Sequence, residues 1–183
     1  RGRVVIFPHH DLAFVERLLT QHAQARRKLI VIESLNGSTG LIAPLGDLFE
    51  LAQAYDAHLV VDESFAVGIL GARGIGGIEH AALMGKHISQ FTGFDRTLAS
   101  SGAALSASRK VCGLVRAAMQ QSSEERPLTP ATCATTEATI NLIEAESTAR
   151  GKLRSSAARV TKELKAMGYR LGGEAGVPII PLV

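Results

Sequence analysis

The sequence has little of what a nucleic-acid or membrane protein needs. It contains no tryptophan, and only 4% of its 183 residues are aromatic, so we do not expect a stacking platform for bases. The net charge is only +3, and the basic residues are scattered rather than gathered in a block. We therefore expect no nucleic-acid partner. No apolar run approaches the ~20 residues that span a bilayer, and no signal peptide opens the chain.

Cysteine is also scarce. Cys112 and Cys133 lack the spacing of a metal site, and the simplest interpretation is a pair of reduced thiols in a cytosol-facing compartment. Hydrophobic residues make up 46% of the chain and charged residues 20%, which favours a compact globular protein over disorder. The length is one domain's worth of chain, enough to bury a core.

Short apolar runs predict a series of β-strands. The run KLIVIE at residues 28–33 has the length of a buried parallel strand. Further strands are expected at residues 3–7, 58–62, 87–92, 103–106 and 179–183. Strand, helix and strand follow one another at the spacing of a βαβ unit. The pattern predicts an α/β fold with a mostly parallel sheet flanked by helices.

Capping residues mark the starts of the helices between these strands. Asp11 is a candidate N-cap, and Pro44 opens an amphipathic helix. Residues 109–121 form another helix. Thr129 and Pro130 begin a long helical stretch that runs to about residue 167, with Gly168 as its stop and Gly151 as a candidate bend.

The chain looks truncated at both ends, because it begins and ends inside expected strands (residues 3–7 and 179–183). We therefore expect residues 1–128 to be part of one large domain. Residues 129–168 would form a connecting helix, and residues 169–183 would begin a second domain that is mostly absent.

One segment combines a strand end with a glycine-rich loop. Residues 60–71, VVDESFAVGILG, are an apolar strand that ends in Asp62 and runs into glycines. In a doubly wound sheet, ligands bind at the carboxyl ends of the strands. A carboxylate there can hydrogen-bond a protonated pyridine nitrogen, or it can cap the following turn. The glycines of residues 68–76 either cradle an anion with their amides or permit close packing, and we favour packing.

Together with residues 94–103, FDRTLASSGA, this segment resembles the α-oxoamine synthases, which are pyridoxal-phosphate (PLP) enzymes that condense an amino acid with an acyl-CoA. The resemblance implies the large domain of PLP fold type I. In that family the second segment reads roughly T-F-S-K-A-L-G-S-S-G-G, and its lysine forms a Schiff base with PLP. Here Arg96 occupies the lysine position. Its guanidinium stays protonated and is no amine nucleophile.

Other family ligands are also replaced. Asp62 matches the aspartate of D-E-A-H, as a vestigial cofactor ligand, but Phe65 stands at the histidine and cannot hydrogen-bond the cofactor. Gly93 stands at a phosphate-binding threonine, with Thr92 next to it as a substitute. Gly37 stands at a loop serine. The family's S-T-S-L-P-P, which reaches the partner subunit, survives only as RPLTP at residues 126–130.

A few remaining residues have weaker claims. Lys86 and Lys110 are the nearest lysines to position 96 in sequence, and we expect both to be solvated. His9 and His10 either cap the following helix or bind metal, but no third ligand is suitably spaced. We expect no metal site.

The resemblance is strongest to the non-catalytic subunit 1 (long-chain base 1) proteins of serine palmitoyltransferase, which also lack the lysine. It implies a heterodimer in which a Lys-bearing catalytic paralogue handles PLP, L-serine and acyl-CoA, while this chain does not bind PLP covalently. It also implies a cytosol-facing protein that an upstream segment attaches to the endoplasmic reticulum membrane. The alternatives are a stand-alone pseudoenzyme that binds a ligand or protein, and an active synthase that uses another amine.

Overall fold

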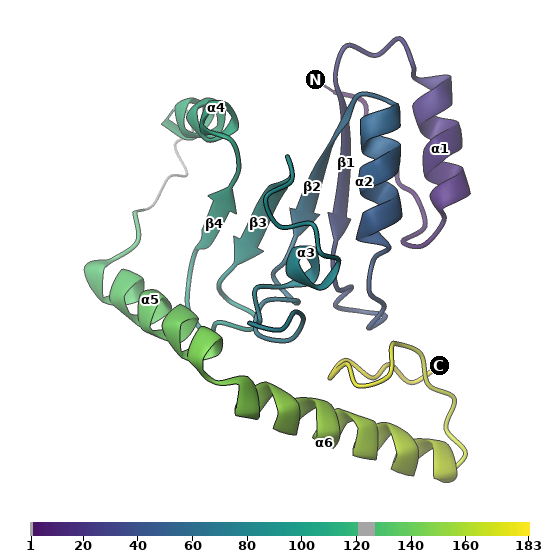
Figure 1. Cartoon of the computed structure of the whole chain (residues 1–183), viewed down its shortest axis with the longest axis vertical. Coiled ribbons are helices and arrows are strands. Elements are labelled where there is room, and N and C mark those ends of the chain that lie inside the picture. Colours follow the sequence, from purple (N-terminus) through teal and green to yellow (C-terminus); the bar gives the residue numbers. More distant parts are fainter. Residues whose placement is uncertain (1, 121–126) are drawn as a thin grey trace.

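The computed structural model describes residues 2–120 and 127–183 and contains a four-stranded sheet in the order β1-β2-β3-β4 (Figure 1). The strands are β1 (Lys28–Glu33), β2 (Ala57–Asp62), β3 (Ser89–Gly93) and β4 (Ala103–Ser106). The first three strands are parallel, and β4 is antiparallel to β3. The expected α/β fold with a mostly parallel sheet is confirmed.

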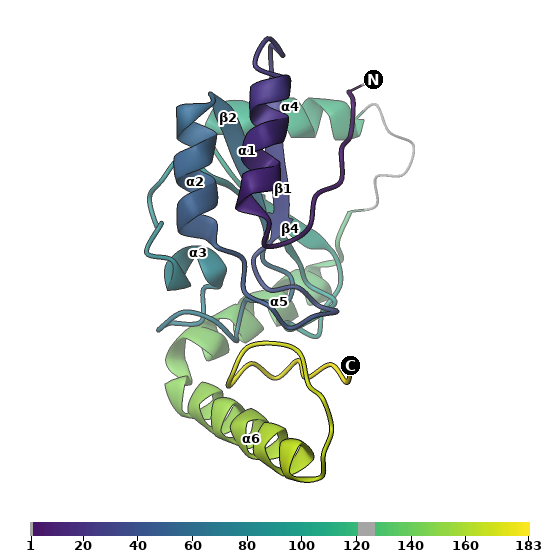
Figure 2. The same cartoon turned by 90° about the vertical axis from the view of Figure 1, so that its right-hand side faces the viewer.

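Helices α1 (Leu12–Gln21) and α2 (Leu45–Ala54) cover one face of the sheet (Figure 2). Alternate side chains of β1 and β2 point into this layer and form the main core with Val15, Leu48 and Phe49. The opposite face is open, since Leu29 is 65% exposed and Val31 60% exposed. The expected parallel strand at residues 28–33 is confirmed, but among the described residues it is buried on one face only. Its apolar run packs on one side only.

The start signals of the helices are confirmed. The Asp11 carboxylate accepts a hydrogen bond from the Phe14 amide at the start of α1. Thr129 caps α5 (Pro130–Ala145) by accepting from the Thr132 amide, and Pro130 is the first helical residue. Helix α4 (Arg109–Gln120) follows β4 as predicted; the last residue of that prediction, Gln121, lies outside the described residues.

Two expected strands are absent from the described structure. Residues 3–7 have a β-rich sequence but form no strand. At residues 179–183 there is only an isolated bridge between Leu171 and Leu182. A strand needs a hydrogen-bonded neighbour as well as apolar residues, and neither segment has a continuous one here. The C-terminal segment instead packs by Val177 and Ile179 against Leu35 and Ala66.

The predicted long helix is two helices. It breaks at Glu146, between α5 and α6 (Ser147–Ala166), and not at Gly151, which lies inside α6. The break is fixed by Arg150, which is only 7% exposed. Its guanidinium donates to the carbonyls of Ile143 and Glu146 and, at 2.8 Å, to Ala72 in the glycine-rich loop. Gly151 is exposed and tolerated without a bend. The proposed division into two domains stays a prediction.

No helix of the described residues is both long enough and apolar enough to cross a membrane.

Replacing Arg150 with methionine should lower the free energy of unfolding by about 1–3 kcal/mol, because the carbonyls of Ala72 and Ile143 lose the hydrogen bonds of this buried guanidinium. Urea unfolding followed by circular dichroism measures the change. Arg154→Met is the matched control, since Arg154 is exposed and makes a single bond to the Ile69 carbonyl. An equal loss in both variants would contradict the role of Arg150.

Candidate functional site

Asp62 ends β2 at the carboxyl edge of the sheet, where it is held by the next turn. Its Oδ1 accepts hydrogen bonds from the Ser64 amide at 2.8 Å and from the Ser64 hydroxyl at 2.5 Å. The same hydroxyl oxygen accepts from the Gly93 amide at 2.7 Å, at the end of β3. Ser64 thus bridges the ends of two neighbouring strands. This matches the turn-capping alternative for Asp62 and uses one of its two carboxylate oxygens.

Three of the altered positions lie against one another. A Cβ added at Gly37 would overlap the edge of the Phe65 ring, at Cε2 and Cζ. The Arg96 guanidinium lies over the same ring, with Cζ 5.2 Å from its centroid, and pairs at 3.4 Å with Asp95. The space beside Phe65 therefore has no room for a serine side chain at position 37, and an arginine–aromatic contact fills the positions that the resemblance assigns to the family's lysine and histidine.

Gly93, at another altered position, packs closely against Ser64. A Cβ at Gly93 would lie 3.0 Å from the Ser64 hydroxyl, so a threonine there would crowd the bridge between the strands. Thr92 does not compensate, because its partner residues in the sheet place it on the opposite face from Asp62. Its side chain is buried and accepts from Gln90 at 3.4 Å. The structure does not bring Thr92 and Asp62 together.

Lys86 and Lys110 lie at the far edge of the sheet. Lys86 precedes β3, whose carboxyl end carries Gly93, and Lys110 begins the helix after the antiparallel β4. Both are therefore at the amino ends of the parallel strands, a strand's length from Asp62 (Figure 1). Neither can take over the role of the missing lysine at position 96.

Glu63, next to Asp62, is a structural centre that the sequence did not reveal. Its carboxylate is completely buried and accepts from the Ser34 hydroxyl at 2.5 Å and from the amides of Gly77 and Ile78, each at 2.7 Å. Burial raises the pKa of Glu63, although these hydrogen bonds lower it in part, and the nearby Asp62 raises it further. A charged residue directly after Asp62 was the only signal in the sequence.

The glycine-rich loop, residues 68–76, places its amides on the chain's own carboxylates. Glu79 accepts from the amides of Arg73 at 3.1 Å and Ile75 at 3.0 Å. Burial tends to raise the pKa of Glu79, but these bonds and the Arg73 charge bring it below its ordinary value. At Gly76, φ is 126°, and a Cβ would lie 2.5 Å from Glu63 Oε2. The glycines thus permit close packing, as expected. The anionic groups that contact the loop are the carboxylates of Glu63 and Glu79.

His9 and His10 take no part in the site at Asp62. His9 Nε2 lies 2.9 Å from the Glu33 carbonyl, and the two imidazole rings are neighbours. Within residues 2–120 and 127–183, no group of three or more His, Cys, Asp or Glu side chains could hold a metal ion. The partner-reaching motif expected at residues 126–130 lies in part outside the described residues.

A PLP Schiff base at position 96 does not fit these residues. At the positions that the resemblance assigns to the family's lysine and histidine stand Arg96 and Phe65, which contact each other, and Asp62 is engaged by Ser64. Because Gly37 packs against Phe65 and Gly93 against Ser64, a serine at position 37 or a threonine at position 93 would crowd its neighbour. We derive no catalytic step through PLP on this chain.

Gly37→Ser should cost about 1–3 kcal/mol of unfolding free energy, because the new side chain meets the Phe65 ring. In a Phe65→Ala background the same change should cost close to nothing, so a double-mutant cycle gives a clear coupling energy. Gly46→Ser is the control, since a Cβ at Gly46 meets nothing within 4 Å. Additive effects of Gly37→Ser and Phe65→Ala would show that the two positions are independent.

The raised pKa of Glu63 predicts a pH dependence of stability. The unfolded carboxyl loses its proton near its ordinary value of 4.5, while the folded one keeps it to higher pH. The contribution of Glu63 is therefore greatest below that value and falls as pH rises through the folded pKa. We subtract the unfolding free energy of Glu63→Gln from that of the wild type. This difference should be smaller at pH 7 than at pH 4.5. A difference that grows with pH would contradict the raised pKa.

Comparison with known proteins identifies the family. The model of aminotransferase class I and II matches residues 1–181. A putative 8-amino-7-oxononanoate synthase of Geobacillus kaustophilus is 31% identical over 97% of this chain, which covers 45% of that protein. The 8-amino-7-oxononanoate synthase of Trichlorobacter lovleyi is 30% identical over the whole chain, which covers 47% of it. The chain thus spans about half the length of these curated relatives.

Among solved structures, a serine palmitoyltransferase of S. paucimobilis with PLP and myriocin bound superposes with a TM-score of 0.88 at 27% identity. The alignment covers 96% of this chain and 45% of that one. The fold is therefore that of a PLP fold type I fragment. The chain belongs to the aminotransferase class I and II family and, within it, to the PLP-dependent α-oxoamine synthases.

Proposed function

We propose that this chain is a non-catalytic subunit of a serine palmitoyltransferase-type complex. That reaction condenses L-serine with a long-chain acyl-CoA to 3-ketosphinganine. The observation that carries the proposal is the packed group of Arg96, Phe65 and Gly37 at the positions of three family ligands. A Lys-bearing catalytic paralogue would supply the amine, the PLP contacts and the binding of both substrates.

Within such a complex, this chain would act as a scaffold. Glu63, Ser64 and Arg150 hold the strand ends and the glycine-rich loop in a fixed arrangement without any reactive group. We expect this rigid edge to complete the interface around the partner's site. We also propose the cytosolic side of the endoplasmic reticulum as its location, which fractionation with the catalytic paralogue would test.

A second candidate rests on the curated relatives. Because they are 8-amino-7-oxononanoate synthases at 30–31% identity, the chain is alternatively a non-catalytic relative of that branch. A third candidate is a stand-alone pseudoenzyme that binds a ligand or protein. The similarity between Asp62–Phe65 (DESF) and the subunit 1 proteins favours the first candidate.

Co-expression tests the choice of partner. The chain should co-purify in equal amounts with a Lys-bearing serine palmitoyltransferase-type paralogue, and CoA release from L-serine and palmitoyl-CoA should require that paralogue's lysine. Preferential assembly with an 8-amino-7-oxononanoate synthase-type paralogue would contradict the first candidate and support the second. A soluble homodimer that co-purifies with neither paralogue would favour the stand-alone pseudoenzyme.

Arg96→Lys alone should not produce turnover, because Phe65, Gly93 and Gly37 still lack the family's polar groups. We expect CoA release by the purified variant, supplied with PLP and both substrates, to equal that of the wild type. Equal thermal unfolding of the two proteins controls for folding. Turnover above the wild type would show that a lysine at position 96 is sufficient and that the other losses are neutral.

A further inference from the structure

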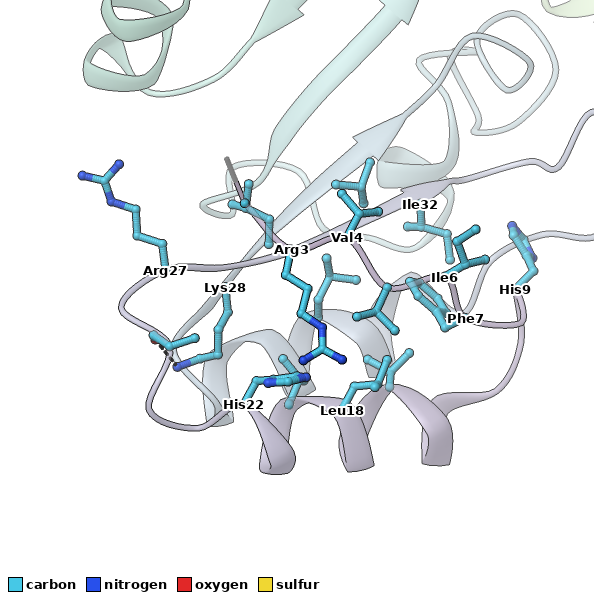
Figure 3. Close-up of a pocket in the computed structure, with 18 of the residues that line it drawn as sticks. Arg3, Val4, Ile6, Phe7, His9, Leu18, His22, Arg27, Lys28 and Ile32 are labelled. Atoms are coloured by element: carbon cyan, nitrogen blue, oxygen red, sulfur yellow. Dashed lines mark hydrogen bonds between the residues drawn. The ribbon is translucent and has the colours of Figure 1, made fainter.

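Asn36 and Gly37 form an asparagine–glycine pair in the loop after β1, at the end of the strand where His9 lies (Figure 3). An asparagine side chain can react with the backbone nitrogen of the next residue, because its Cγ and that nitrogen close a succinimide ring. Glycine favours this reaction, since it has no side chain to shield the nitrogen. The pair is half-buried, while the neighbouring Ser38 and Thr39 are exposed, so water reaches it.

The loop places hydrogen-bond donors around the side-chain oxygen of Asn36. Oδ1 accepts from the Ser38 amide at 3.1 Å, from the Thr39 amide at 2.8 Å and from the Thr39 hydroxyl at 2.9 Å. A backbone N–H can only donate, so the atom that faces these amides is the oxygen and not the side-chain nitrogen. Donors held in this way stabilise the negative charge that develops on a carbonyl oxygen when a nucleophile attacks. The Asn36 side chain is therefore activated toward attack at Cγ.

The side-chain nitrogen of Asn36, which is the leaving group in this reaction, faces a carboxylate. Nδ2 donates to Glu33 Oε2 at 2.8 Å. Once the Gly37 nitrogen has attacked, both nitrogens are bonded to Cγ, so a carboxylate that contacts Nδ2 is also near the Gly37 proton. Glu33 can then take this proton and deliver it to Nδ2, which is general base and general acid catalysis by one group.

The Gly37 nitrogen is not engaged elsewhere. Among residues 2–120 and 127–183, no hydrogen bond uses the Gly37 N–H. The backbone around it is anchored, since the Asn36 amide donates to the Leu41 carbonyl at 3.0 Å and the Gly40 amide donates to the Asn36 carbonyl at 2.9 Å. Restricting both reacting groups in this way lowers the entropic cost of closing the ring.

We propose that Asn36 is a self-modifying residue, which loses its side-chain amide in the folded chain through attack by the Gly37 nitrogen. The bond between that nitrogen and Cγ forms, and the bond between Cγ and Nδ2 breaks. The Gly37 proton passes through Glu33 to Nδ2, which departs as ammonia. Water then opens the succinimide at either carbonyl and leaves aspartate or isoaspartate at position 36, with no oxidant or reductant. This modification is independent of the proposed function.

Both products change the loop. Each puts a second carboxylate beside Glu33, where the hydrogen bond from Nδ2 is lost and like charges repel. Isoaspartate also adds a methylene group to the backbone before Gly37, which packs against Phe65. It shifts Gly40 as well, whose carbonyl accepts from the Glu174 amide of the C-terminal segment at 3.0 Å. The modification therefore loosens the loop at the carboxyl edge of the sheet.

Peptide mapping of the whole 183-residue chain by mass spectrometry tests the proposal. Trypsin cuts after Lys28 and Arg73, so one peptide carries position 36, and a sample taken at the start corrects for deamidation during digestion. We expect the amide of Asn36 to be lost about tenfold or more faster in the folded chain at neutral pH than in the same chain unfolded in guanidinium chloride. Asn141, inside α5 and followed by Leu142, is the internal control and should keep its amide. Equal or slower loss in the folded chain overturns the proposal.

Glu33→Gln isolates the proton transfer, because glutamine keeps an acceptor for Nδ2 but cannot carry the proton. It should slow the loss of the Asn36 amide about tenfold in the folded chain and leave the rate in the unfolded chain nearly unchanged. Thr39→Val removes one donor to Oδ1 and should slow the loss several-fold. Circular dichroism checks that both variants are folded, and the wild-type comparison decides alone if they are not. A folded Glu33→Gln chain that loses the amide at the wild-type rate also overturns the proposal.

Discussion

The arrangement of this half of the fold depends on one buried carboxylate. The Glu63 carboxylate accepts hydrogen bonds from the Ser34 hydroxyl, just after β1, and from the two amides that begin α3 (Gly77–His80). Glu63 itself directly follows β2. Because the carboxylate is shielded from water, every one of its acceptor sites must be satisfied by the protein. The glycines at 76 and 77 are required for this approach. The carboxyl edge of the sheet is thus fixed independently of any cofactor.

At this edge, the positions that the resemblance assigns to family ligands lie in two packed groups. Phe65 fills the space beside Gly37 and lies under Arg96, while Ser64 joins Asp62 to Gly93. Each group is packed closely enough that a side chain added at Gly37 would overlap the Phe65 ring, and one added at Gly93 would crowd the Ser64 hydroxyl. The carboxyl edge of the sheet is thus filled by the chain's own packed and hydrogen-bonded side chains.

Much of the fold could be predicted from the sequence, because β1, β2 and the starts of α1 and α5 depend on local signals such as apolar runs, Asp11 and Thr129. The strand expected at residues 3–7 is not formed, because a strand also needs a hydrogen-bonded neighbour, which a local sequence pattern does not show. At the site, motif spacing predicts that Arg96 and Phe65 stand at the family's lysine and histidine positions, and that assignment stays a prediction. The spacing could not show that Gly37 lies against Phe65 or that Arg150 reaches Ala72, because these contacts join distant parts of the chain.

The most direct test of the changed centre is the intact mass of the chain after incubation with PLP and reduction with borohydride, which fixes any Schiff base as a stable adduct. The account predicts no stoichiometric adduct, because position 96 carries an arginine and the lysines at 86 and 110 lie at the far edge of the sheet. A single adduct mapped to one lysine would contradict it, since the chain would then hold a rebuilt PLP site.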